Sequence, residues 1–120
     1  MAGATKLDGA GMAKLKTLEE GLVLYGRIHA LTEQFGLALK QNKPTMQYVT
    51  QIKRNLPTLA SNLKNQFGMI SDLIMAVNLA SSRGASEQVK LRGLREGLAQ
   101  IKQALEIAVT QTKTKHAVEE

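Results

Sequence analysis

The 120-residue sequence contains no cysteine and no tryptophan, only two prolines, and only four aromatic residues, two Tyr and two Phe. Without cysteine the chain forms no disulfide and offers no thiolate ligand to a metal. The apolar residues, 43% of the chain, are therefore mainly Leu, Ala, Ile, Val and Met. This composition favours packed helices over a β-sandwich, because aromatic and β-branched residues are enriched in strands.

Residues that commonly carry catalysis are also scarce. The two histidines are His29 and His116, and the chain has no HExxH motif, no cysteine nucleophile and no phosphate-binding glycine loop. His29 follows Ile28, and we interpret it as a histidine at the edge of the core. The alternative, a ligand role, lacks the partner residues that a metal site needs. We therefore expect a protein that is not an enzyme and holds neither a cofactor nor a metal.

Long hydrophobic runs are missing too. Residues 1–16 contain no continuous apolar stretch of signal-peptide length. No segment approaches the roughly 18 apolar residues of a membrane-spanning helix. We expect a soluble, cytoplasmic protein without a membrane partner.

Helical periodicity, in contrast, is abundant. Apolar residues recur every three or four positions in three segments: Gly11–Lys40, Thr45–Arg83 and Glu87–Lys113. Pro44 separates the first segment from the second, and Ser86 is a suitable N-cap for the third. The sequence therefore predicts an all-α fold, an antiparallel up-down helical bundle of three long helices.

Pro57 leaves the number of helices open. It lies inside the apolar pattern of the second segment, where a proline costs about 3 kcal/mol and removes one backbone hydrogen bond. The segment is either one kinked helix or a short helix followed by a new one capped by Asn55, which makes four helices. In both cases residues 10–115 form the bundle, between a flexible tail at 1–9 and a polar tail at 116–120.

Positive charge is concentrated in the middle of the chain. The formal net charge is +6 for the whole chain, yet residues 40–95 alone carry +7. Their acidic residues are Asp72 and Glu87, and their basic residues are Lys40, Lys43, Lys53, Arg54, Lys64, Arg83, Lys90, Arg92 and Arg95. This asymmetry favours an anionic partner, above all nucleic acid.

Six cations are the candidate phosphate contacts: Lys53, Arg54, Lys64, Arg92, Arg95 and Lys102. The last three share a stripe because of their spacing, and the two lysines of the second segment share a face about three turns apart. If the second and third segments lie side by side, these cations merge into one surface with salt-dependent affinity for phosphates. The alternative is a solvated face that only keeps the protein soluble.

The few aromatic residues limit the kind of nucleic acid. Proteins that bind single strands stack bases on aromatic side chains. Here Tyr25, Phe35 and Phe67 fall on the core stripes, and only Tyr48 lies off them. Contact with the backbone of structured RNA therefore fits better than base readout, so RNA is favoured over DNA.

The segment 68–80 is apolar around most of its circumference. Met69, Leu73 and Met75 are therefore candidates for a protein interface, used for self-association or for docking on a larger protein. Central burial of this segment inside the bundle is the alternative.

The stretch from Leu56 to Val109, with Leu63-Lys64-Asn65-Gln66-Phe67-Gly68 and Leu94-Arg95-Glu96-Gly97-Leu98, resembles the four-helix-bundle accessory proteins of diversity-generating retroelements in size, charge and pattern. Proteins of that family bind a reverse transcriptase and its template RNA. The resemblance implies a ring-like homo-oligomer, a pentamer, whose basic surface meets RNA or DNA. It also implies a larger protein partner, a reverse transcriptase or another ribonucleoprotein subunit. The small helical subunits of multi-subunit CRISPR effector complexes are similar in size and charge.

The sequence thus predicts a non-catalytic, nucleic-acid-binding accessory subunit of a ribonucleoprotein. The rival hypothesis is a structural adaptor or oligomerisation module that binds a protein partner through the apolar helix face, without nucleic acid. The salt dependence of binding distinguishes the two, because only phosphate contacts release counterions.

Overall fold

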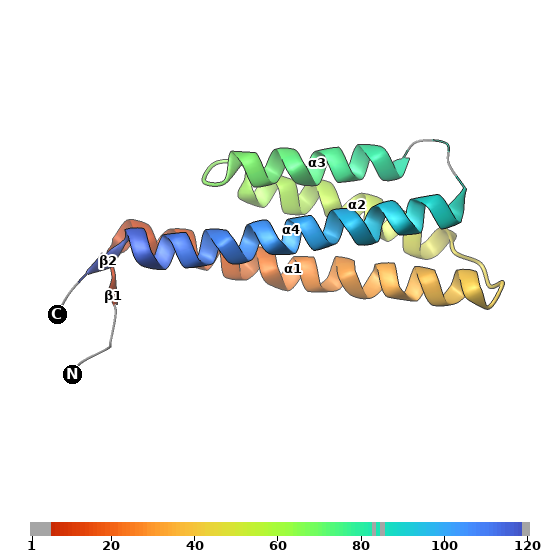
Figure 1. Ribbon diagram of the computed structural model, residues 1–120, viewed down its shortest axis with the longest axis horizontal. Coiled ribbons are helices and arrows are strands. Elements are labelled where there is room, and N and C mark those ends of the chain that lie inside the picture. Colours follow the sequence, from red (N-terminus) through yellow and green to blue (C-terminus); the bar gives the residue numbers. More distant parts are fainter. Residues whose placement is uncertain (1–5, 83, 85, 119–120) are drawn as a thin grey trace.

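In the computed structural model the protein is a bundle of four helices with a short two-stranded ladder at one end (Figure 1). The structure describes residues 6–82, 84 and 86–118. Its elements are β1 (Lys6–Leu7), α1 (Gly9–Lys40), α2 (Met46–Leu63), α3 (Gly68–Ser82), α4 (Glu87–Lys115) and β2 (Ala117–Val118). The predicted all-α bundle is confirmed, and of the two helix numbers left open the described residues form four.

The helices pack in a ring in chain order. Helix α1 packs against α2 and α4, and α3 packs against the same two helices, so α2 and α4 occupy diagonally opposite corners. Short connections join consecutive helices and make them antiparallel. The bundle measures 57 × 26 × 18 Å. None of the helices in the described part of the chain has the length and apolar character that crossing a membrane requires.

The second predicted segment is broken at residues 64–67 and not at Pro57, which is a correction to the sequence-based expectation. Pro57 lies inside α2, and the helix continues through it. The next residue, Thr58, donates its hydroxyl to the Arg54 carbonyl at 3.2 Å. At the true break, the Phe67 N–H bonds the Leu63 carbonyl at 2.7 Å, and the chain then reverses into α3.

The core is made of aliphatic residues at helical spacing, with Phe35 as its fully buried aromatic side chain. The large apolar side chains that are no more than 2% exposed come from all four helices: Leu18, Ile28, Phe35, Ile52, Leu56, Leu59, Leu63, Ile74, Leu94, Leu98, Ile101 and Leu105. Helices α3 and α4 approach closely at Gly97, where an added Cβ would lie 2.7 Å from the Val77 methyl groups. The predicted apolar stripes are therefore the core faces.

Local signals end and begin the helices where the sequence suggests. Asn42 adopts a left-handed conformation (φ 55°) after α1, while the Lys43 N–H bonds the Ala38 carbonyl at 2.8 Å. This is a Schellman ending, followed by the helix-breaking Pro44. The predicted N-cap of α4 is confirmed, because the Ser86 hydroxyl accepts from the Val89 N–H at 3.3 Å.

The two ends of the described chain pair with each other, where the sequence predicts a flexible tail at 1–9 and a polar tail at 116–120. Strand β1 pairs antiparallel with β2, with Lys6 opposite Val118 and Leu7 opposite Ala117. Asp8 is the N-cap of α1, and His116 is the C-cap of α4. Residues 6–9 and 116–118 therefore belong to the fold, while residues 1–5 and 119–120 lie outside the described part.

Candidate functional site

The candidate cations do not form the single surface that the sequence predicts, and this is a second correction. That surface requires the second and third segments to lie side by side. The part of the second segment that carries Lys53, Arg54 and Lys64 is α2 with its C-cap, and α2 is diagonal to α4. The apolar piece, α3, is the one that packs beside α4. The cations are therefore distributed over separate corners of the bundle.

Arg95 is the one candidate cation with a carboxylate partner among the described residues. Its Nε donates to Glu33 Oε2 at 3.1 Å, across the α1–α4 interface. The other close contact between a basic and an acidic side chain in this part of the chain joins His116 to Asp8, with His116 Nδ1 3.1 Å from Asp8 Oδ1. Arg54, Lys64, Arg92 and Lys102 are exposed, and no described carboxylate lies within ion-pair distance of them.

Lys53 of α2 lies close to residues of α3 and α4. It is half-buried, and together with Lys90 of α4 and Ser81 of α3 it lines a cavity of about 10 Å³. Ser81 belongs to the last turn of α3, where free carbonyl groups attract cations. Lys53 and Lys90 therefore lie near the end of α3, where a cation can stabilise the helix independently of nucleic acid.

A hollow of about 280 Å³ lies between α1 and α4, and both Arg95 and Lys102 line it. Tyr25 also lines this hollow, and its ring stacks on the ring of His29, with the two centroids 6.2 Å apart. Burial, and to a smaller extent the Glu106 charge, raises the pKa of Tyr25 above its ordinary value of 10.0. His29 thus lies beside a core aromatic ring, at the edge of the core as its position predicts.

Helix α3 exposes apolar side chains in addition to those that it buries. Met69 is 88% exposed, Leu79 is 58% exposed and Met75 is 44% exposed, whereas Leu73 is half-buried. Met69 and Leu73 are four residues apart and share a face, while Met75 is six residues from Met69 and points about 120° away. The three candidate interface residues therefore belong to two flanks of α3.

The flank with Met69 and Leu73 forms one wall of an apolar groove of about 560 Å³. The opposite wall is formed by the C-terminal half of α4, from Ala104 to Lys115, with its C-cap His116, and Lys14 of α1 also lines the groove. This groove has about twice the volume of the hollow between α1 and α4, which is about 280 Å³. No pattern in the sequence predicts this groove.

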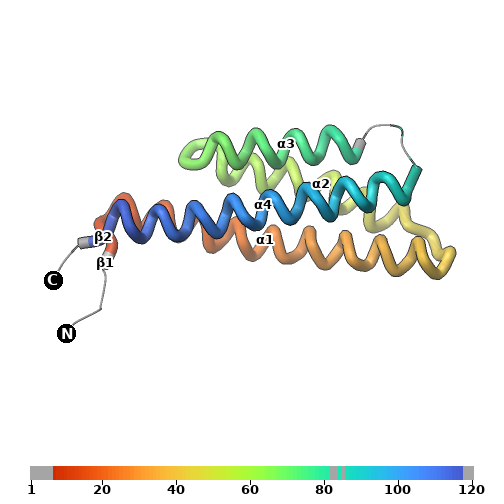
Figure 2. Tube along the Cα trace, viewed as in Figure 1, coloured from red at the N-terminus to blue at the C-terminus, as the bar shows by residue number. Residues whose placement is uncertain are grey.

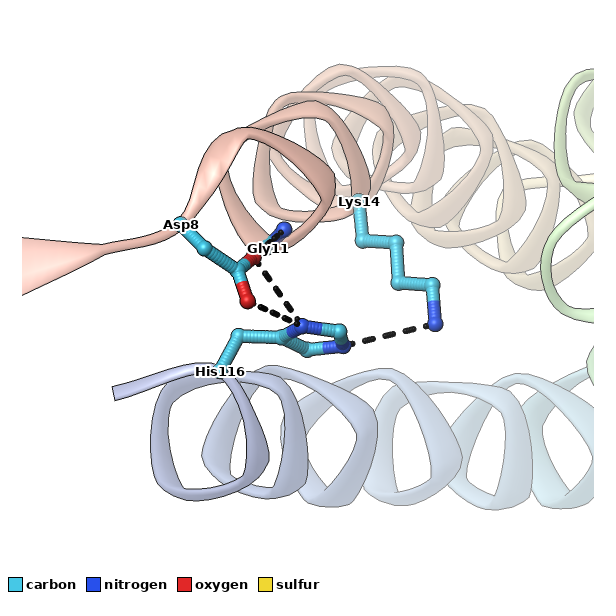
Figure 3. Close-up of polar contacts among 4 residues, drawn as sticks. All are labelled: Asp8, Gly11, Lys14 and His116. Carbon is cyan, nitrogen blue, oxygen red and sulfur yellow. Dashed lines mark hydrogen bonds and ion pairs between the residues drawn. The ribbon is translucent and has the colours of Figure 1, made fainter. Parts of the chain in front are cut away.

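Asp8 and His116 hold the two ends of the chain together (Figure 3). Asp8 Oδ1 accepts from the Gly11 N–H at 2.6 Å and lies 3.1 Å from His116 Nδ1. On the other side of the ring, Lys14 Nζ lies 3.4 Å from His116 Nε2. Because an ammonium group only donates, Nε2 accepts there and the Nδ1–H points at the Asp8 carboxylate. We call these three residues, Asp8, Lys14 and His116, the terminal clasp.

The terminal clasp changes the acidity of Asp8. The hydrogen bond from the Gly11 backbone and then the bond to His116 lower the pKa of Asp8 below its ordinary value of 3.8. The carboxylate therefore stays ionised while it caps α1. In sequence the partners are 108 residues apart, so no spacing rule could have joined them.

Other chemistry and other proteins add no further site. In the described ranges, no three His, Asp or Glu side chains gather in a way that could hold a metal ion. No protein-family model matches the chain, and comparison with curated proteins and with solved structures finds no match either. The resemblance to retroelement accessory proteins therefore stays a prediction.

Proposed function

We propose that the protein is a non-catalytic accessory subunit that assembles through α3 and binds the phosphates of structured RNA through its unpaired cations. The observation that carries the proposal is the separation of the two kinds of surface. Helix α3 contains no Lys or Arg, and its one charged residue is Asp72. Arg54, Lys64, Arg92 and Lys102 lie on or next to α2 and α4 and have no carboxylate partner in the described chain.

Exposed apolar side chains on α3 support self-association. Met75 and Leu79 lie on the outer side of this helix, with the small residues Ala76 and Ala80 close by. Small residues let two helices approach closely, and a two-fold axis would pair the same strip on both copies. Because the strip carries no cation, two copies can meet there although each has a net charge of +6.

Assembly also compensates for the scattered positions of the cations on one copy, because it brings cations of several copies to the same RNA. A single subunit presents only a few phosphate contacts on each side. Several copies on one RNA combine their contacts, and linked weak sites bind far more tightly than each site alone. Binding of this kind depends on shape and phosphate position, with little base readout.

The experiment is a fluorescence-anisotropy titration of a hairpin RNA at low salt. The double variant Arg92→Gln/Lys102→Gln should weaken binding at least about tenfold, because each lost phosphate contact removes a charge-assisted hydrogen bond. Arg27→Gln on α1, an exposed cation outside the proposed set, is the matched control and should change affinity little. If Arg27→Gln loses as much RNA affinity as the double variant, the proposed phosphate contacts are contradicted.

The second candidate is the adaptor function without nucleic acid, and the exposed face of α3 favours it as well. Assembly in solution together with no detectable RNA binding at low salt would select this candidate over the first.

A further inference from the structure

The groove exists because the α2–α3 hairpin is shorter than the α1–α4 pair. The Leu63 side chain, at the end of α2, lies against Gly21 of α1, so the turn at 64–67 lies twelve residues after the start of α1 at Gly9. Twelve helical residues span about 18 Å. Figure 2 shows the green turn ending well short of the red and blue helix ends. Over this length neither of the other two described helices covers the inner faces of α1 and α4.

One end of the groove is apolar. Ile70 and Leu73 of α3 face Ala104 and Ile107 of α4 across it. Ile107 remains 48% exposed, although it lies in a wall of apolar residues. The groove volume of about 560 Å³ falls within the roughly 300–1,000 Å³ that is typical of small-molecule sites.

The other end of the groove is positively charged. Lys14 and Lys115 line it beside His116, and no carboxylate is among the described residues that line the groove. Gly68 and Met69, the first residues of α3, line the groove as well. The first N–H groups of a helix have no carbonyl partner within the helix and carry partial positive charge. Two lysines and a helix N-terminus therefore favour an anionic group at this end.

We propose that this groove binds a single-chain anionic amphiphile of the fatty-acid class. The carboxylate lies between Lys14 and Lys115, near the start of α3. The alkyl chain lies between α3 and α4, against Leu73 and Ile107. A ligand of this class matches both ends of the groove at once: apolar area is removed from water at one end, and charge is neutralised at the other.

A second copy of the chain fits less well, because its projecting turn carries Lys64, and docking this turn in the groove would bring that cation towards Lys14 and Lys115. A partner helix is the other occupant that the titrations below test.

The test is isothermal titration of the full chain with dodecanoate below its micelle concentration. We expect saturable binding of one dodecanoate per chain. Dodecyl maltoside, with the same chain and no charge, and acetate, with the charge and no chain, should each bind at least about tenfold more weakly. Equal affinity for dodecanoate and dodecyl maltoside, or no saturable binding of dodecanoate, would overturn the proposal.

Variants locate the site. Lys14→Gln and Lys115→Gln should each weaken dodecanoate binding about tenfold, and Ile107→Ser should weaken it as well without disturbing the core. Lys113→Gln is the matched control, because Lys113 lines a separate hollow beside Leu7 and Leu15, and it should bind like the wild type. If Lys113→Gln weakens binding as much as Lys14→Gln, the contact is general surface charge and the proposal fails. If an acidic amphipathic helical peptide binds tighter than dodecanoate and displaces it, the occupant is a protein segment and the proposal fails too.

Discussion

The Arg95 guanidinium lies across Gly36 and donates to the Glu33 carboxylate, with Nε 3.1 Å from Oε2. An added Cβ at Gly36 would lie 2.8 Å from an Arg95 terminal nitrogen, so the absence of a side chain at this position makes room for the crossing. Among the α4 cations that the sequence predicts to contact phosphate, Arg95 is thus partly neutralised, whereas Arg92 and Lys102 have no described carboxylate partner.

Glu33→Gln should release Arg95 for an anionic partner. Both side chains of the pair are about half exposed, so the loss of the pair should change the free energy of unfolding by less than about 1 kcal/mol. Affinity for hairpin RNA should rise, because a negative charge leaves the surface. Arg95→Gln in the wild-type background should reduce affinity less than Arg92→Gln does. Anisotropy titrations of the three variants check this, and a larger loss for Arg95→Gln would show that the ion pair does not withhold Arg95.

Gly97→Ala should destabilise the bundle, because the new Cβ would lie 2.7 Å from the Val77 methyl groups. Overpacking of this kind costs about 1–3 kcal/mol, and the better helix propensity of Ala returns at most about 1 kcal/mol. Gly93→Ala, one turn away on the same helix, meets no atom within 4 Å and should stabilise the protein by about 0.5–1 kcal/mol. Urea unfolding measures both changes. In a Val77→Ala background, Gly97→Ala should reduce the free energy of unfolding by less than it does in the wild type. If the reduction is unchanged, the new Cβ does not clash with Val77.

Asp8→Asn should lower the melting temperature at neutral pH and leave it nearly unchanged in strong acid. The pKa of Asp8 is lowered in the folded chain by its bonds to the Gly11 backbone and to His116. A lowered pKa stabilises the fold above the ordinary value of 3.8, and this contribution is lost as the pH falls through the lowered pKa. Melting curves between pH 7 and pH 2 check this.

The control for that series is Asp72→Asn, which removes an exposed carboxylate from α3. If the melting temperatures of wild type and Asp8→Asn differ by as much at pH 2 as at pH 7, the terminal clasp does not depend on the Asp8 charge.

Leu79→Glu should disrupt self-association. Leu79 is 58% exposed on α3, so a carboxylate there is tolerated in the single chain but costly in an apolar interface. Light scattering of the wild type should give a mass at least twice the 13.0 kDa of one chain, and the variant should give the mass of one chain. Val23→Glu, which changes a 63% exposed residue of α1, is the control and should assemble like the wild type. A wild type that remains monomeric at high concentration would rule out assembly through α3.

The periodicity of apolar residues was enough to predict the helices and most of the core, because buried residues such as Ile28, Leu56 and Ile101 belong to patterns that repeat every three or four positions. It could not locate the turn at 64–67. Leu63, Phe67 and Ile70 keep the helical spacing through the turn, so a reversal of the chain and a continuous helix give the same pattern. The proline inside α2 was the more conspicuous signal, yet the helix continues through it.

The candidate sites were harder to predict than the fold. Whether α2 lies beside α4 or diagonal to it depends on where the chain reverses, and that decides which cations share a face. The groove depends on a difference in helix length, and the terminal clasp on contacts between the two ends of the chain. None of these follows from the spacing of residues within one segment.

The salt dependence of RNA binding tests the proposed function most directly. With about four to five phosphate contacts, the slope of log affinity against log salt for a hairpin RNA should be about −3 to −4. Binding should therefore weaken more than tenfold between 50 and 200 mM salt, while circular dichroism shows unchanged helix content. A flat salt dependence, or no binding at the lowest salt, would contradict the proposal that the unpaired cations contact phosphates.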